Sequence, residues 1–121
     1  MTRVIHIIVL VLLLVNGTHK ISYVETSGCW VYMYDENGHR YKTITTSSVG
    51  KVKGDSSVFF VSQNGSWIYL YDIEGQRYKT LGLSSVGTVT GVSGETFTSR
   101  NGPLFYTWNK DRKKINTMTA R

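Results

Sequence analysis

The chain has 121 residues, of which 18% are charged, and it carries a formal net charge of +6. This length suits one domain with a modest hydrophobic core. Twelve glycines, eight tyrosines and a single proline argue against a helical fold and predict an all-β protein with many short strands and tight turns. The basic residues are spread along the chain, which favours a solvated strand face over a polyanion groove, so nucleic acid is not an expected partner.

Residues 1–17 have the pattern of a hydrophobic leader helix. Met1-Thr2-Arg3 is followed by an apolar run at 4–15, broken only by His6. The run is short for a membrane span, which needs about 20 residues. We therefore predict a secretory leader or an uncleaved N-terminal anchor, with the mature domain at 18–121 and a secreted, periplasmic or cell-surface location. Membrane contact is expected only through an uncleaved leader, and a buried strand or core helix stays open as the alternative.

The rest of the chain repeats itself roughly every 37 residues. The segment GCWVYMYDENGHRYKT at 28–43 returns as GSWIYLYDIEGQRYKT at 65–80, and more loosely at 102–117. The predicted units are 28–64, 65–101 and a partial one at 102–121. The last unit replaces its turn glycine with charged residues, which is typical of a capping repeat.

Each unit is expected to hold four antiparallel strands. Residues 67–72 alternate with apolar side chains on both faces, which predicts a strand covered on both sides. A tight turn and a partner strand at 76–81 follow, then a loop at 82–85 and two further strands. The Asn-Gly pair at 64–65 predicts a two-residue hairpin turn. About eleven strands are expected, beginning on the second strand of a unit, with no helix after the leader.

No pattern of catalytic residues recurs with the repeat. Asp35 and Asp72 precede turns, with Asn109 at the third position, and this placement is typical of side chains that cap their own turn. The histidines have no spaced metal-binding partners, and elbow, phosphate-loop and Cys-x-x-Cys motifs are absent from the sequence. We predict no enzyme activity, no cofactor and no metal site. Cys29 is the single cysteine, so it cannot form a disulfide within the chain, and a bridge between chains stays open.

The segment NGSWIYLYDIEGQRYKTL at 64–81 resembles the third strand, turn and fourth strand of WD-repeat and NHL-type β-propeller blades. The shared features are an aromatic-Asp pair before a glycine turn and a basic Lys-Thr-Leu strand. The segment at 84–90 resembles the inner strand of a next blade. The repeat is shorter than in those families, lacks their Gly-His pair and supplies fewer than three full units.

The resemblance implies a propeller-like arrangement of tandem four-stranded repeats. A closed propeller has about four to eight blades, so two such chains could close as one ring, and a homo-oligomer is expected. A β-trefoil or an open stacked β array are the alternatives. Small lectins similar to this arrangement bind sugars between blades through aromatic and basic side chains. That likeness gives the candidate ligand-binding residues Trp30, Trp67, Trp108, Arg40 and Arg77, although aromatic side chains in strand centres also serve packing alone.

These observations predict an exported, non-catalytic binding module that recognises a glycan or another surface ligand through aromatic grooves between repeats. The alternative is a structural protein that assembles through exposed blade faces and strand edges.

Overall fold

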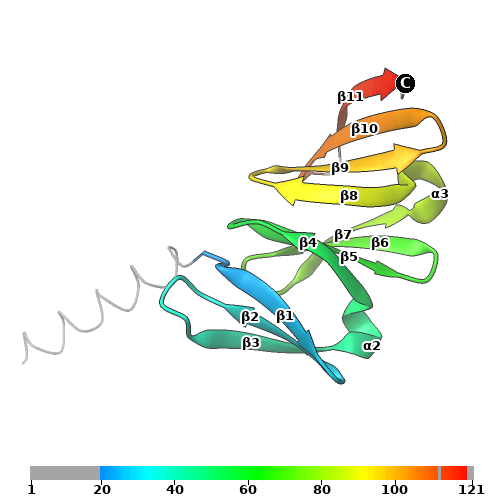
Figure 1. Cartoon of the computed structure of the whole chain (residues 1–121). Coiled ribbons are helices and arrows are strands. Elements are labelled where there is room, and N and C mark those ends of the chain that lie inside the picture. Colours follow the sequence, from blue (N-terminus) through cyan, green and yellow to red (C-terminus); the bar gives the residue numbers. More distant parts are fainter. Residues whose placement is uncertain (1–19, 112, 120–121) are drawn as a thin grey trace, which may run out of the picture.

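The computed structural model describes residues 20–111 and 113–119 and contains three antiparallel sheets (Figure 1). The predicted leader at 1–17 lies outside these residues. The first sheet consists of β1 (Tyr23–Ser27), β2 (Trp30–Tyr34) and β3 (Arg40–Thr45). The middle sheet consists of β4 (Lys51–Asp55), β5 (Phe59–Asn64), β6 (Trp67–Asp72) and β7 (Arg77–Gly82). The last sheet consists of β8 (Thr88–Ser93), β9 (Thr96–Asn101), β10 (Leu104–Asn109) and β11 (Lys114–Thr119). The all-β prediction is confirmed.

Consecutive strands pair within each sheet, so every sheet is a meander. Strands at matching places in two sheets carry residue numbers that differ by 37, as Phe60 in β5 and Phe97 in β9 illustrate. The described part of the first sheet begins with β1, which corresponds to β5 and β9 in this register. Asp72 accepts hydrogen bonds on Oδ1 from the backbone N–H groups of Glu74 and Gln76, both at 3.0 Å, and Asp35 and Asn109 cap their turns in the same way.

Two expectations about the connections are wrong. The segment at 82–85 was expected to be a loop, but Leu83–Val86 forms a helical turn, α3, and Thr46–Val49 forms the matching turn, α2. A single turn is too short to leave a helical period in the sequence. The hairpin turn between β5 and β6 consists of Gly65 and Ser66, because Asn64 still pairs with Trp67 across the two strands. Gly65 has a φ of +61°, a conformation that glycine adopts readily.

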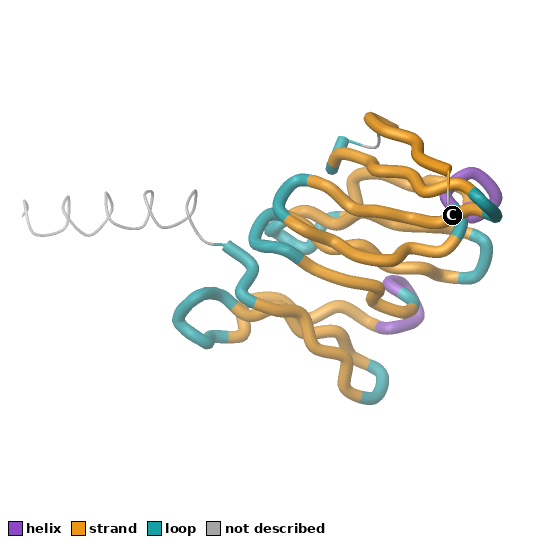
Figure 2. Tube along the Cα trace, turned by 45° about the horizontal axis from the view of Figure 1, so that its top comes forward, coloured by secondary structure: helices purple, strands orange, loops and turns teal. Residues whose placement is uncertain are grey.

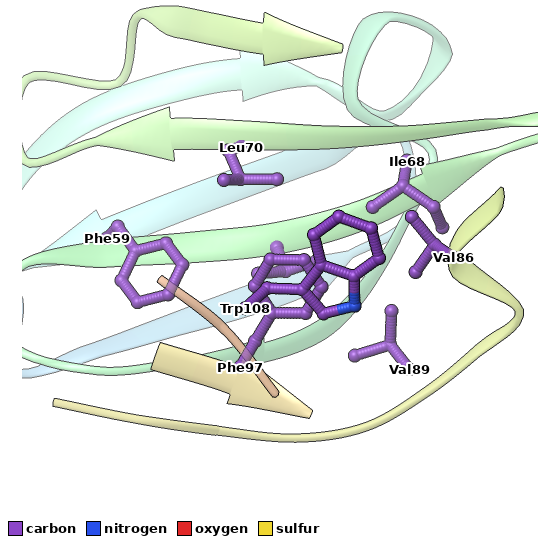
Figure 3. Packing of buried hydrophobic residues seen from close by; sticks show 8 residues of the cluster. Phe59, Ile68, Leu70, Val86, Val89, Phe97 and Trp108 are labelled. Carbon is purple, nitrogen blue, oxygen red and sulfur yellow. The ribbon is translucent and has the colours of Figure 1, made fainter. Parts of the chain in front are cut away.

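The sheets lie one on another (Figure 2), in the order in which they follow one another along the chain (Figure 1). Apolar side chains are buried between them. The cluster between the first and middle sheets contains Ile21, Val31, Met33, Val49, Phe60 and Tyr71. The cluster between the middle and last sheets contains Phe59, Val61, Ile68, Leu70, Val86, Val89, Phe97 and Trp108 (Figure 3). The middle sheet is therefore covered on both faces, as the apolar pattern of 67–72 predicts.

Hydrogen bonds between sheets add to this packing. The Tyr41 hydroxyl donates to the carbonyl oxygen of Ile73 at 2.6 Å, and the Tyr78 hydroxyl donates to the carbonyl oxygen of Lys110. Burial raises the pKa of both tyrosines. The first strands of the middle and last sheets also approach closely, because a Cβ atom added to Gly54 would lie 2.8 Å from Val92 Cγ2. No helix within 20–111 and 113–119 is long and apolar enough to cross a membrane.

Candidate binding groove

A groove of about 470 Å³ lies between the first and middle sheets. The first sheet and its helical turn contribute Ile44, Ser47 and Ser48 to the lining. The middle sheet contributes Asn64, Tyr69, Tyr71, Gln76 and Arg77. Most of these side chains are polar or aromatic, so the groove offers hydrogen-bonding groups and ring edges more than an apolar pocket.

The wall formed by α2 is held in place by three hydrogen bonds from the middle sheet. Asn64 Nδ2 donates to the carbonyl oxygens of Ser47 and Ser48 at 3.1 and 3.3 Å, and the Tyr71 hydroxyl donates to that of Ser48 at 3.4 Å. These carbonyls belong to the helical turn, in which the closing backbone hydrogen bond uses the Thr46 carbonyl and leaves those of Ser47 and Ser48 for other donors. The groove is therefore a fixed feature of how the two sheets join.

The charged end of the groove is a guanidinium held over an aromatic ring. Arg77 Cζ lies 4.3 Å from the centroid of the Tyr69 ring, and Tyr69 meets Tyr71 edge to face at 6.4 Å. Burial raises the pKa of Tyr71, while the charge of Arg77 opposes that rise. A guanidinium stacked on a ring keeps its N–H donors in its own plane, where they remain available to an oxygen-rich ligand.

The predicted site residues occupy different surroundings. Arg77 lines the groove. Trp67 is exposed and is the cross-strand partner of Asn64, which also lines the groove. Trp30 is also exposed, on the free side of the first sheet, where Arg40 lies 3.6 Å from the centroid of the Tyr32 ring. Trp108 differs from the other two tryptophans, because it is only 6% exposed and stacks on Phe97.

Asn64, Tyr69, Tyr71 and Gln76 line the groove but were not among the predicted site residues. A signal for Asn64 was present in the sequence, because Asn-Gly and Ser-Ser pairs both recur with the repeat. At the next junction Asn101 Nδ2 donates to the carbonyl oxygens of Ser84 and Ser85. Asn64 and Ser47 are 17 residues apart in the sequence, so the hydrogen bond between them could not be predicted from a local pattern.

The junction between the middle and last sheets repeats this arrangement with altered side chains. Lys114 Nζ lies 3.9 Å from the centroid of the Tyr106 ring, as Arg77 lies over Tyr69. Trp108 replaces Tyr71, and its Nε1 donates to Ser99 Oγ at 3.0 Å. The Lys114 ammonium group replaces the planar guanidinium of Arg77, so the two junctions present different hydrogen-bond donors to a ligand.

The described part of the chain contains no group of three or more His, Cys, Asp or Glu side chains that could hold a metal ion. Asp55 accepts a hydrogen bond on Oδ2 from the Val24 N–H at 3.1 Å, and burial raises the pKa of this carboxyl group. Its role is thus to join two sheets. Cys29 is exposed and carries a free thiol. Comparison of the sequence with known protein-family models and with curated proteins finds no match.

Proposed function

We propose that the chain is an exported, non-catalytic binding module with propeller-like sheets, and that the groove between the first two sheets binds a carbohydrate. The observation that carries the proposal is Arg77 stacked on Tyr69 at the groove, with the exposed Trp67 on the same strand face two positions before Tyr69. Sugars combine C–H faces that pack on aromatic rings with hydroxyl groups that need hydrogen-bond partners. Trp67 supplies the first kind of surface, and Asn64, Gln76 and Arg77 supply the second.

The export part of the proposal is supported by the leader pattern at 1–17. The binding part is supported by the position of the groove, since ligand sites favour concave junctions between structural units.

The test is a glycan array followed by titration of the best ligand, with tryptophan fluorescence as the readout. Trp67→Phe should remove most of the ligand-dependent change in emission. Trp30→Phe is the matched control, because Trp30 is exposed at the equivalent strand position but lies away from this groove. Arg77→Ala should weaken binding about ten- to a hundredfold, since a hydrogen bond to a charged group contributes about 1.5–3 kcal/mol. Equal loss in the Trp30 and Trp67 variants would contradict the assignment to this groove.

A structural role is the second candidate, favoured by apolar side chains that the last sheet exposes. Phe105, Ile115 and Met118 are 38%, 54% and 58% exposed. A protein whose function is to build filaments should form particles that grow steadily with concentration, without any added ligand. Light scattering over a range of concentrations distinguishes this behaviour from that of a discrete binding module.

A further inference from the structure

Two sheet faces pack against no other part of the described chain. The free face of the first sheet carries Tyr23, Trp30, Tyr32 and Tyr34, because these residues alternate with the buried Val31 and Met33 and their neighbours. The free face of the last sheet carries Phe105, Ile115 and Met118, of which Phe105 and Met118 are opposite each other in the strand register. Exposed apolar patches of this kind often mark contact surfaces.

The two free faces correspond to the two sides of the interfaces already formed inside the chain. Between the first and middle sheets, Val24 and Met33 pack in one cluster with Phe60 and Tyr71. Moving 37 positions forward twice from Val24 and Met33 leads to Thr98 and Thr107, on the free face of the last sheet.

Moving 37 positions back from Phe60 and Tyr71 leads to Tyr23 and Tyr34, on the free face of the first sheet. Tyr23 and Tyr34 keep the parallel stacking of Phe60 and Tyr71, with ring centroids 4.5 Å apart. The free face of the first sheet therefore corresponds to the side that the middle sheet contributes to this internal interface. The free face of the last sheet corresponds to the side that the first sheet contributes.

Both free faces carry hydroxyl-bearing side chains at positions where the internal interfaces carry apolar side chains. Where Phe60 and Phe97 occupy the internal aromatic position, the free face carries Tyr23 with an added hydroxyl. At the internal interfaces these aromatic rings face a valine and either methionine or leucine. At the matching positions the free face of the last sheet carries Thr98 and Thr107, which also have hydroxyl groups. Hydroxyl groups on both sides can pair with each other when the faces meet and with water when they separate.

We propose that a second copy of this chain docks the free face of its last sheet on the free face of the first sheet, head to tail. The contact continues the stacking of the internal sheets. It would place the second copy's Met118 where Ile44 stands at the internal groove, opposite Tyr32 and Arg40. A head-to-tail contact closes into a ring or extends into a filament, according to its rotation.

The test is the mass of the full chain by size-exclusion chromatography with light scattering. The expected mass is at least twice 13.7 kDa at high concentration. Tyr23→Glu places a charge on one face, and Met118→Glu places a charge on the other, so each variant alone should elute as one chain. Thr117→Glu is the matched control, since Thr117 is exposed on the same strand but points to the opposite face, and it should assemble normally.

Mixing the two variants makes the test specific for orientation. The Tyr23→Glu variant retains an intact last sheet and the Met118→Glu variant an intact first sheet, so a 1:1 mixture should form a dimer with one interface. Association of either variant alone would indicate a contact between like faces and overturn the proposal. A single-chain mass for the unmodified protein at every concentration would also overturn the proposal. In that case a different protein, and not a second copy, would be the partner of these faces.

The docking proposal rests on sheet packing and stands apart from carbohydrate binding. The Met118→Glu variant leaves the groove between the first and middle sheets unchanged, so ligand titration of this single-chain form tests the carbohydrate proposal independently.

Discussion

Tyr71 stacks on Phe60 with ring centroids 4.7 Å apart and ring planes within 1° of each other. The same relationship recurs between Phe97 and Trp108, at 5.8 Å and 4°, where the surrounding side chains enclose both rings (Figure 3). Each pair joins the second and third strands of its sheet and faces the preceding sheet. The stacked aromatic pair is therefore the repeated unit of packing from which the successive interfaces are built.

Removing one ring of the internal pair should cost much more than removing its exposed counterpart. Phe60 is fully buried, so Phe60→Ala should lower the free energy of unfolding by about 3–5 kcal/mol. Tyr23→Ala removes the equivalent ring, which is 45% exposed, and should cost well under half as much. Denaturant unfolding at low protein concentration measures both. Equal losses would show that stacking within a sheet, and not packing between sheets, accounts for the stability.

The sequence predicts the sheets well because their signal is local and repeated. Alternation at 67–72 and the turn around Gly75 specify a hairpin without reference to the rest of the chain, and a second copy at 28–43 confirms the strand register. The role of Asp72 was also predictable, since a side chain that caps its own turn involves only neighbouring residues.

The groove was less accessible to sequence reasoning because it depends on contacts between units. Nothing local to Trp108 distinguishes a buried indole from an exposed one, although it shares the strand position of Tyr71 and not that of Trp67. The helical turn at Thr46–Val49 is too short to show a helical period in the sequence. Asn64, which donates hydrogen bonds to it, lies on a strand of the next sheet. Packing between sheets decides these features.

Two equivalent serines should respond in opposite ways to the loss of their hydroxyl groups. Ser62 Oγ is buried and makes no hydrogen bond with any described residue, whereas Ser99 Oγ accepts one from Trp108 Nε1. Ser62→Ala removes an unsatisfied polar atom and should leave the free energy of unfolding unchanged or slightly higher. Ser99→Ala leaves a buried indole N–H without an acceptor and should cost about 1–3 kcal/mol. A marked loss in Ser62→Ala would reveal a partner for that hydroxyl, such as a buried water.

Two glycines with positive φ separate backbone strain from steric exclusion. Gly50 has a φ of +82°, and a Cβ atom there would lie 2.3 Å from the carbonyl oxygen of Gln63. Gly65 has a φ of +61°, with nothing within 4 Å of the added atom. Gly65→Ala should cost about 1–2 kcal/mol from strain alone. Gly50→Ala adds a backbone clash where α2 meets β5, so its midpoint of thermal unfolding should fall much further. Similar midpoints for the two variants would contradict this close approach.

Alkaline pH should destabilise the protein through the tyrosines that join neighbouring sheets. Burial raises the pKa of Tyr41 to about 12, whereas an unfolded tyrosine titrates near about 10. The folded state therefore holds the proton more tightly, so this contribution to stability is complete below pH 10 and is lost as pH rises toward 12. Tyr78, with the equivalent bond to Lys110, shifts in the same direction.

Tyr41→Phe removes both the titrating group and its hydrogen bond to the Ile73 carbonyl. At pH 7 the variant should lose about 0.5–1.5 kcal/mol, the usual net contribution of such a bond. Between pH 10 and 12 its stability should fall less steeply than that of the unmodified chain, so the two curves should converge. Urea unfolding at several pH values measures both curves. Parallel curves across that range would mean that the Tyr41 hydroxyl has the same pKa in the folded and unfolded states. That result would contradict the rise in pKa expected from the burial of Tyr41 between the sheets.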